Sequence, residues 1–591
     1  MKTERVSRDL RPLLAHVRPH RGRLVVALVL GLGFSAGSLA IPLVVRTVLD
    51  ELTASGDARS GPPDISMWVL VLVGLIVVSG ALGFAQWLVL GRLAERVVFD
   101  ARSSLVRRLL SAAVPELARR STGELVTRVT SDTLLLREAA AMSIVMVVNG
   151  AVALAGALAL MASLDIVLFA TMIGAVVVIG GAVALLLPFL GREQARSQAA
   201  VGALGGLLSG VLGAVRTVKA SGTEERESAR ILAFARTSMV HRVRAVRGEA
   251  LAMTCAGVGI QVAVVAVLAL GGWRAGAGLL TIPTLVAFLL YAFQIAEPAT
   301  SLAMHVGRLQ TGIAAAARIA DVHRLPTEIV GFAPDATSAP SPAIRAASDP
   351  ILRFDGVVAG YGGAPVLRGV DLVIPRRGHV AVVGPSGAGK STAFGVLMRF
   401  IEPSAGSVSL DGRDLSSLSI RAVRQQIAYV EQSAPWIPGS LRENVRYRHP
   451  DADDAEVRRA LDAVGLLDIA DALPHGLDTD IDGDEFSGGE RARVAFARAI
   501  LRPPAIILLD EATAQLDGIS EASVRRLVAD LARVSVVVTI AHRLSTVIDA
   551  DRIYVFDGGR TRASGTHVEL LESDEMYRRL VSGLRMTPLA S

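Results

Sequence analysis

A glycine-rich segment that contains one lysine is the part of the sequence best suited to chemistry. It reads Gly384-Pro385-Ser386-Gly387-Ala388-Gly389-Lys390-Ser391-Thr392, between a β-branched run at 380–383 and a helical run at 393–400. This strand, loop and helix order is the context of a phosphate-binding loop. Glycines let successive backbone N–H groups turn toward phosphate oxygens, and the helix start adds its dipole. The segment predicts a nucleotide site in which Lys390 contacts the β- and γ-phosphates and Ser391 holds Mg²⁺.

An acidic pair follows a second buried strand. The run at 506–509 reads Ile-Ile-Leu-Leu and ends in Asp510-Glu511. Open α/β sheets bind their ligands at the carboxyl ends of strands, so this pair is expected beside the phosphate loop. Asp510 suits the Mg²⁺ shell, and Glu511 can polarise an attacking water. The alternative is a solvated acidic pair that simply ends a strand.

A second segment is suited to anions. It reads Phe486-Ser487-Gly488-Gly489-Glu490 and precedes a helical run at 491–501. Two glycines at a helix start expose backbone N–H groups to a phosphate. Because the chain already has one phosphate loop, a second such helix start indicates that its nucleotide comes from another copy.

The composition and its distribution indicate that a membrane segment precedes these motifs in the chain. The chain has 591 residues, of which 51% are hydrophobic and 20% charged, and its single cysteine is Cys255. This composition excludes a disulfide-rich secreted fold and argues against disorder. The net charge of +6 comes from arginines that alternate with long uncharged stretches, so it indicates basic loops and no nucleic-acid partner.

The first 305 residues offer six apolar runs of about 20 residues, the length that crosses a bilayer. The runs lie at about 24–48, 67–90, 141–164, 166–190, 251–271 and 279–303. Arginines before the first run, and acidic residues after it, predict a cytosolic N-terminus. The long Arg-rich segments 91–140 and 191–249 are then cytosolic, and their glycine- and proline-free stretches 92–114 and 224–247 predict helical arms. A pair of amphipathic surface helices is the alternative reading of these arms.

Prolines mark the junction between the two halves. Pro326, Pro334, Pro340, Pro342 and Pro350 define a linker at 325–350. The expected organisation is therefore a membrane α-helical domain at 1–324, the linker, an α/β P-loop ATPase domain at 351–585, and a tail at 586–591.

The P-loop, the Ser-Gly-Gly segment and the Asp-Glu strand, in this order, resemble the ABC transporter ATPase over residues 351 to about 584. With the six spans ahead of it, the chain looks like an exporter-type half-transporter. The resemblance implies ATP and Mg²⁺ as cofactors. It also implies a second copy, or a related half-transporter, as partner in a multi-pass protein of the cytoplasmic membrane whose ATPase domain is cytosolic.

More positions match that family. The resemblance implies that Tyr361 stacks on adenine, that Gln432 lies at the Mg²⁺ and membrane-domain junction, that Asp517 lies at the dimer interface, and that His542 contacts the γ-phosphate. Residues 121–132, and 215–220 with Glu224-Glu225, are similar to the family's two cytosolic arms. A lone tyrosine or histidine is more often structural, so each assignment depends on the whole pattern.

The sequence also departs from the family. Phe486 and Glu490 stand where Leu and Gln are commonest, and 479–485 is about two residues shorter than usual. The same stretch opens like a calcium loop at Asp478-Thr479-Asp480-Ile481-Asp482-Gly483. Its twelfth position is Gly489 where a bidentate glutamate is required, so a solvated acidic loop is the expected reading.

The resemblance implies ATP-driven transport of a hydrophobic, amphipathic or peptide-like substrate, with export expected. Import by the same machine and a membrane-anchored ATPase without cargo are the alternatives. Polar residues within spans are costly and often functional. The candidates for substrate contact are Asn149, Gln261, Gln294 and Glu297. Bonds between helices, or contact with water at a helix end, would explain them without a substrate.

Overall fold

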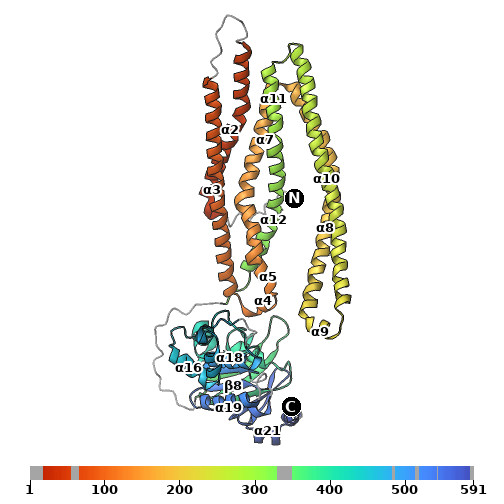
Figure 1. The fold of residues 1–591 in the computed structure, drawn as a ribbon. Coiled ribbons are helices and arrows are strands. Elements are labelled where there is room, and N and C mark those ends of the chain that lie inside the picture. The colour runs from red at the N-terminus through yellow and green to blue at the C-terminus, as the bar shows by residue number, and fades with distance from the viewer. Residues whose placement is uncertain are drawn as a thin grey trace. The chain divides into compact units, whose positions relative to one another are not determined.

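The computed structural model describes residues 13, 17–54, 66–328, 349–481, 486–512, 518–541 and 543–585. The chain divides into two compact units. The membrane unit is Met1–Val106 with Gly123–His323, and the P-loop unit is Arg107–Thr122 with Arg324–Ser591. Figure 1 labels their elements. Most of the expected linker, 329–348, and the tail 586–591 lie outside the described residues.

Within the described residues, six helical segments of the membrane unit are long and apolar enough to cross a bilayer, which agrees with the expected membrane α-helical fold class. Their elements are α2 (Arg21–Ala54), α3 (Ser66–Leu110), the series α5 (Thr122–Thr127), η2 (Arg128–Asp132), α6 (Thr133–Arg137), η3 (Glu138–Ser143) and α7 (Ile144–Leu164), then α8 (Ile166–Gly213), α10 (Glu224–Gly276), α11 (Ile282–Gln294) and α12 (Ala296–His323). The segments that adjoin the Arg-rich arms are longer than the apolar runs inside them, because the arms continue the same helices.

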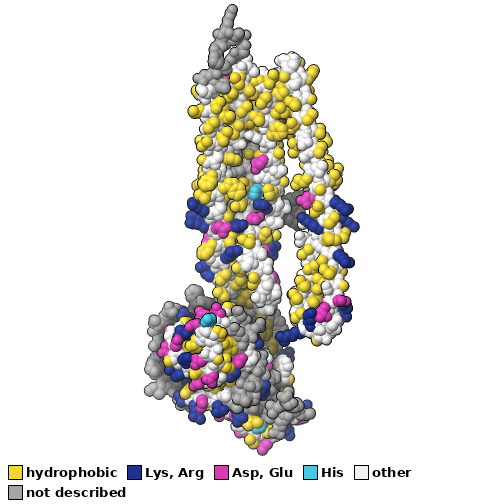
Figure 2. All heavy atoms as spheres, viewed as in Figure 1, with side chains coloured by type: hydrophobic (Ala, Val, Ile, Leu, Met, Phe, Trp, Pro, Cys, Tyr) yellow, Lys and Arg dark blue, Asp and Glu magenta, His cyan; other side chains and the backbone are white. Residues whose placement is uncertain are grey.

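Apolar side chains cover the outer faces of these helices. Val29, Leu70, Val178 and Leu185 are among many large hydrophobic side chains that are exposed. Figure 2 shows this yellow band over one end of the membrane unit, with charged side chains toward the other end. A water-soluble protein does not expose so much contiguous apolar area, whereas a bilayer covers it.

The two arms are helical, as the sequence predicts. Helices α8 and α10 pack against each other along their length, and the short α9 (Val215–Ala220) lies between them in the chain. Their polar contacts include His241 Nδ1 to Glu193 Oε2 at 2.7 Å and Ser197 Oγ to Ser238 Oγ at 3.1 Å. The hydrogen bond from His241 lowers the pKa of the Glu193 carboxyl. Burial has a smaller, opposite effect, so the pKa lies below its ordinary value.

A partly buried ion pair joins the third span to α12. The guanidinium of Arg318 donates to both carboxylate oxygens of Asp132, with Nε to Oδ2 at 2.9 Å. Asp132 is buried and ends the π-helical turn η2. Arg128, in the same turn, donates to the backbone oxygen of Arg318 at 3.1 Å. The acidic end of the motif at 121–132 therefore fixes the position of α12.

The P-loop unit is built on two sheets. A six-stranded sheet has the order β10-β9-β3-β8-β7-β6, in which β9 through β6 are parallel. A four-stranded antiparallel sheet has the order β2-β1-β4-β5. The strands are β1 (Leu352–Ala359), β2 (Leu367–Ile374), β3 (Gly378–Val383), β4 (Ala405–Leu410), β5 (Arg413–Asp414), β6 (Ile427–Val430), β7 (Ile506–Asp510), β8 (Val536–Ile540), β9 (Arg552–Asp557) and β10 (Arg560–Gly565).

Helices bury both faces of the parallel sheet, which explains why its central strands are continuously apolar. All five residues of β7 and of β8 are buried. The helices include α13 (Lys390–Leu397), α14 (Ile420–Gln425), α15 (Leu441–Arg446), α16 (Asp454–Ala463), α17 (Leu467–Ala472), α18 (Gly488–Ile500), α19 (Gly518–Ala532), α20 (Leu544–Ile548), α21 (His567–Ser573) and α22 (Glu575–Arg585). Register pairs Asp510 with Ile540 and Val382 with Ile540, so the carboxyl ends of β3, β8 and β7 meet at one edge.

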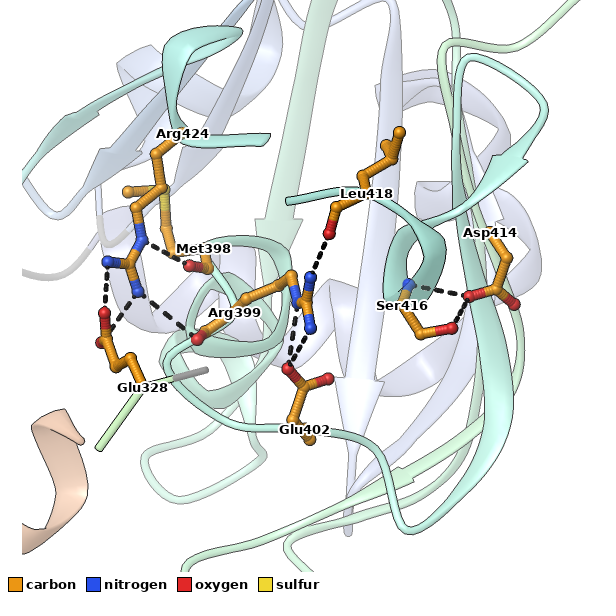
Figure 3. A network of polar contacts seen from close by, with 8 residues as sticks. All are labelled: Glu328, Met398, Arg399, Glu402, Asp414, Ser416, Leu418 and Arg424. Atoms are coloured by element: carbon orange, nitrogen blue, oxygen red, sulfur yellow. Dashed lines mark hydrogen bonds and ion pairs between the residues drawn. The ribbon is translucent and has the colours of Figure 1, made fainter. Parts of the chain in front are cut away.

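The P-loop unit includes two segments that flank the membrane helices in the chain. The loop after α3, which leads to α4 (Val114–Ala118), pairs with the residues after α12: Ala113 N donates to Pro326 O and Glu328 N donates to Ser111 O, both at 2.9 Å. Arg424 on α14 binds the Glu328 carboxylate through two bonds of 2.7 and 2.9 Å (Figure 3). The start of the linker is thereby attached to the P-loop unit.

Arg424 is positioned for this pairing by its surroundings. Its guanidinium also donates to Met398 O at 2.9 Å and lies 4.8 Å from the ring centre of Phe400. Glu328→Gln is expected to destabilise the P-loop unit by about 1 kcal/mol, because a charge-assisted bidentate pair becomes a neutral one. In a unit of this size the unfolding midpoint should fall by roughly 2–4 °C.

Glu402 supplies the matched control. It accepts two bonds from Arg399 near the same network, but its side chain is 54% exposed. Exposed pairs contribute little, so Glu402→Gln should leave the midpoint almost unchanged in thermal melts of the full chain. Equal shifts for the two variants would contradict the role given to Glu328.

Candidate nucleotide-binding and hydrolysis site

The phosphate loop has the backbone that the sequence predicts. It runs from the end of β3 to α13, and Gly384, Gly387 and Gly389 have φ of 154°, 79° and 99°. These values favour glycine. A Cβ on Gly384 would also lie 2.3 Å from the carbonyl oxygen of Phe556, so no other residue fits there without displacing β9.

Lys390 is held against this loop. It is buried, and its Nζ donates to Gly384 O at 2.7 Å and to Pro385 O at 3.0 Å. Burial lowers the pKa of Lys390, and the carboxylates of Glu511 and Asp510 act in the opposite direction. The amine therefore lies within the curve of the loop, beside the acidic pair, where a triphosphate would add further stabilisation of its charge.

The structure brings the acidic pair to the phosphate loop. Asp510 ends β7 and accepts a bond from Ser391 Oγ at 3.3 Å. Its second oxygen accepts from the hydroxyl of Tyr429 at 3.3 Å. Burial raises the pKa of Asp510, and the bonds from Tyr429 and Ser391 oppose this increase. Sequence reasoning missed Tyr429; its place at the end of the neighbouring strand β6 was the available signal.

Glu511 has a strained backbone and an ordered side chain. Its φ is +50°, a left-handed conformation that costs a non-glycine residue about 1–2 kcal/mol. Its N–H donates to Ile540 O at 3.2 Å, and its Oε2 accepts from Gln432 Nε2 at 2.7 Å. Such strain concentrates at functional sites. Two residues assigned to catalysis, 79 positions apart, are thus in direct contact.

The Ser-Gly-Gly segment begins α18. Ser487 caps this helix: its Oγ accepts from Glu490 N at 3.3 Å, while Glu490 Oε2 accepts from Ser487 N at 2.7 Å. This reciprocal pair accounts for an acidic residue at position 490. Phe486, the other unusual residue, is buried with its ring centre 5.1 Å from that of Trp436. Both departures from the family pattern are locally satisfied.

A cavity of about 620 Å³ lies beside the phosphate loop. Its lining includes Tyr361, Ser391 and Asp510. It also includes Pro115, which is in α4, and Arg119, which directly follows α4. Arg119 also donates to the backbone oxygen of Tyr361. The ring of Tyr361 is half exposed, which leaves it available for stacking on a flat ligand. None of Ser487, Gly488, Gly489 and Glu490 lines this cavity.

Some expected site residues lie outside the described residues, namely Asp517 and His542, as do 482–485 of the stretch before α18. Among the residues that the structure describes, no group of three or more His, Cys, Asp and Glu side chains could hold a metal ion. Of the substrate candidates, Asn149 and Glu297 line one cavity of the membrane unit. Gln294 instead donates to Ser38 O at 3.4 Å, and Gln261 is exposed on α10 outside that cavity.

A helical membrane unit with six spans, followed by a P-loop unit with an ordered carboxylate beside its phosphate loop, defines a nucleotide-driven membrane protein. Residues 24–298 match the ABC transporter transmembrane region, and residues 367–514 match the ABC transporter family. The chain therefore belongs to the ABC transporter family.

Its relatives and a solved structure extend over nearly the whole chain. An ATP-dependent lipid A-core flippase of Chromobacterium violaceum is 32% identical, with 93% of each chain covered. The human mitochondrial potassium channel ATP-binding subunit is 30% identical over 96% of this chain and 77% of its own. A multidrug efflux ATP-binding/permease protein of Mycobacterium tuberculosis is 30% identical over 96% of this chain and 47% of its own.

The structure of a bacterial Atm1-family ABC exporter with ATP bound aligns with a TM-score of 0.77 and 26% identity, over 97% of this chain and 99% of that one. The chain is accordingly a half-transporter of the exporter type, in which ATP hydrolysis is coupled to transport.

Proposed function

We propose that the protein exports an amphipathic substrate across the cytoplasmic membrane by alternating access driven by ATP. The observation that carries the hydrolytic part is the 2.7 Å contact between Gln432 and Glu511 beside the phosphate loop. Flippase and multidrug efflux relatives support an amphipathic cargo. The arginines that precede the first span support a cytosolic N-terminus, and with it a cytosolic P-loop unit.

Two copies of the chain form the working unit in this proposal. Ser487 to Glu490 cap a helix whose N–H groups suit an anion, yet they do not line the cavity at the phosphate loop. Each ATP is then held between the P-loop of one copy and the Ser487 segment of the other. Asp517 is assigned to the interface between the copies. Since one chain carries both half-sites, a homodimer suffices, and a related half-transporter is the alternative partner.

Glu511 is the proposed general base. Gln432 fixes its carboxylate by a hydrogen bond, and its backbone has the left-handed conformation. Glu511 can then accept a proton from a water that attacks the γ-phosphate. His542 is assigned to contact with the γ-phosphate, and Tyr361 to stacking on adenine. Closure of the two copies brings the arms together, and hydrolysis resets them.

Mg²⁺ fits the residues at the phosphate loop. Ser391 Oγ and an oxygen of Asp510 lie 3.3 Å apart, and Gln432 lies next to Glu511. Mg²⁺ takes oxygen ligands, usually one or two from protein with the remainder from phosphates and water, and Ser391 and Asp510 can supply such ligands. When bound, it would neutralise charge that develops on the β- and γ-phosphates.

A relative named as the ATP-binding subunit of a potassium channel favours a second candidate function. In this reading the protein is a membrane-anchored ATPase that regulates another component and moves no cargo itself. Import by the same machine is the remaining alternative.

Directional flux separates these functions. In sealed proteoliposomes with the P-loop unit outside, a fluorescent lipid analogue and a panel of amphiphiles are expected to enter the lumen only with ATP and Mg²⁺. Glu511→Gln protein, reconstituted at the same density, is the matched control and should give no flux. ATP-driven loss from preloaded vesicles would indicate import, and robust hydrolysis without movement of any compound would favour the anchored ATPase.

A further inference from the structure

A cavity of about 710 Å³ lies inside the membrane unit, between α2, α3, α7 and α12. Its lining includes six large apolar and polarisable side chains: Phe34, Phe84, Trp87, Met142, Met146 and Met304. Aromatic rings and flexible thioethers accommodate hydrocarbon of varied shape. Such a lining can hold an apolar tail, but it does not explain the polar residues in the same wall.

Two carboxamides in that wall are buried without a full set of partners. Gln86 and Asn149 are 4% and 7% exposed. Among the described residues, Gln86 Nε2 and Asn149 Oδ1 have no hydrogen-bond partner. Both side chains meet α2 at Gly31, where a Cβ would lie 1.7 Å from Asn149 Nδ2 and 2.3 Å from Gln86 Nε2. A Cβ at this position would force both amide groups to move, so Gly31 allows their close approach to α2.

A carboxylate lines the same cavity. The side chain of Glu297 is exposed into it, near the first turn of α12. A Cβ on Gly150 would lie 3.6 Å from Pro298 O, so the chain next to Asn149 touches the chain next to Glu297. Within the described ranges, the Glu297 carboxylate has no ion pair or hydrogen bond. Arg308 on the same wall forms an ion pair of 3.8 Å with Glu138.

The carboxylate and the two amides in the cavity wall favour some ligands over others by charge and hydrogen bonding. An unpaired carboxylate in an apolar wall attracts a cation and repels an anion. One unpaired amide N–H group and one unpaired amide oxygen favour a ligand with an uncharged acceptor and donor. Figure 2 shows acidic, histidine and basic side chains set among the yellow side chains of these helices. A plain hydrocarbon would leave both kinds of group unsatisfied.

We propose that this cavity binds a peptide-like amphiphile, with its ammonium at Glu297, an uncharged amide at Gln86 and Asn149, and its apolar tail among the rings and methionines. The inference rests on the proposed export function, whose substrate class it names. Binding precedes any use of ATP, so the cavity can be tested without nucleotide.

Three probes with the same tail separate the contributions. Radiolabelled glycine dodecylamide carries an ammonium and an amide, N-acetylglycine dodecylamide lacks the charge, and dodecylammonium lacks the amide. Binding is measured on the full chain in nanodiscs without nucleotide, and empty nanodiscs are subtracted. We expect glycine dodecylamide to bind about tenfold more tightly than either other probe, which is a typical effect of one such contact.

Variants then assign each preference to its residue. Glu297→Gln should abolish the preference over the acetylated probe, and Asn149→Leu should abolish the preference over dodecylammonium while keeping the other. Thr171→Val, on α8 outside the cavity, should bind all three probes like the unmodified chain. If a variant fails to fold, the three-probe comparison on the unmodified chain still decides.

Equal affinity of the unmodified chain for all three probes would overturn the proposal. Unchanged probe preferences in Glu297→Gln and Asn149→Leu, together with loss of dimer in crosslinking, would also overturn it, because the polar groups would then belong to an interface between copies. Absence of ATP-driven flux for every compound would contradict the export function, even if the probes bind as expected.

Discussion

Glu511→Gln is expected to bind ATP with unchanged affinity and to hydrolyse it at least about 100-fold more slowly, because an amide cannot accept the proton of the attacking water. Glutamine has nearly the same volume and can still pair with Gln432, which now lies 2.7 Å from Glu511 Oε2. The backbone at φ +50° should therefore keep its conformation. The Glu511→Gln variant is therefore expected to lose ATP hydrolysis and to keep ATP binding.

Two measurements check this prediction. Steady-state phosphate release gives the turnover, and equilibrium binding of a fluorescent ATP analogue gives the affinity. Glu402→Gln, an exposed carboxylate outside the site, should hydrolyse ATP at the normal rate. Preserved turnover in Glu511→Gln would show that another group is the base. A joint loss of binding and turnover would show that Glu511 supports the fold of the site.

The local motifs of the nucleotide site were predictable from sequence because their chemistry is contained in a few adjacent residues. The phosphate loop needs glycines at positions of positive φ, and Gly384, Gly387 and Gly389 supply them within six residues. The same holds for the start of α18, where Ser487 and Glu490 form a reciprocal cap. Residue types at short spacing are therefore enough to indicate such features.

Contacts between distant segments could not be read from the sequence. Tyr429 meets Asp510 only because β6 and β7 are neighbours in the sheet, and a lone tyrosine at a strand end gives little sign of its partner. Arg318 and Asp132 are 186 positions apart. Many arginines of the chain could have been assigned to that carboxylate with equal reason. The pair can therefore be identified only once the packing of the helices is known.

The division of the chain shows the same limit. Hydropathy and prolines give a boundary near residue 324, whereas the compact P-loop unit also includes Arg107–Thr122. This segment pairs with the residues after α12 through Ala113 and Pro326, and Arg119 bonds to Tyr361. Sequence patterns report local burial, and they do not report which unit an exposed helical turn contacts.

Lys390→Ala and Ser487→Arg are each expected to abolish turnover in a homodimer, and a mixture of the two proteins is expected to regain part of it. In the proposed dimer, Lys390 supplies charge to the phosphates from the loop, while Ser487 begins the helix that completes the site of the other copy. Arginine at that helix start removes the cap and opposes the dipole. Both homodimers then have two defective sites.

A mixed dimer has one site in which both defects meet and one site that is entirely intact. Random pairing makes half of the dimers mixed, so a co-expressed sample should recover up to about one quarter of normal turnover if one site suffices. Separate affinity tags allow the mixed dimer to be purified, and circular dichroism confirms that both variants are folded. Full activity of the Ser487→Arg homodimer, or a purified mixed dimer no more active than its parents, would contradict a site shared between copies.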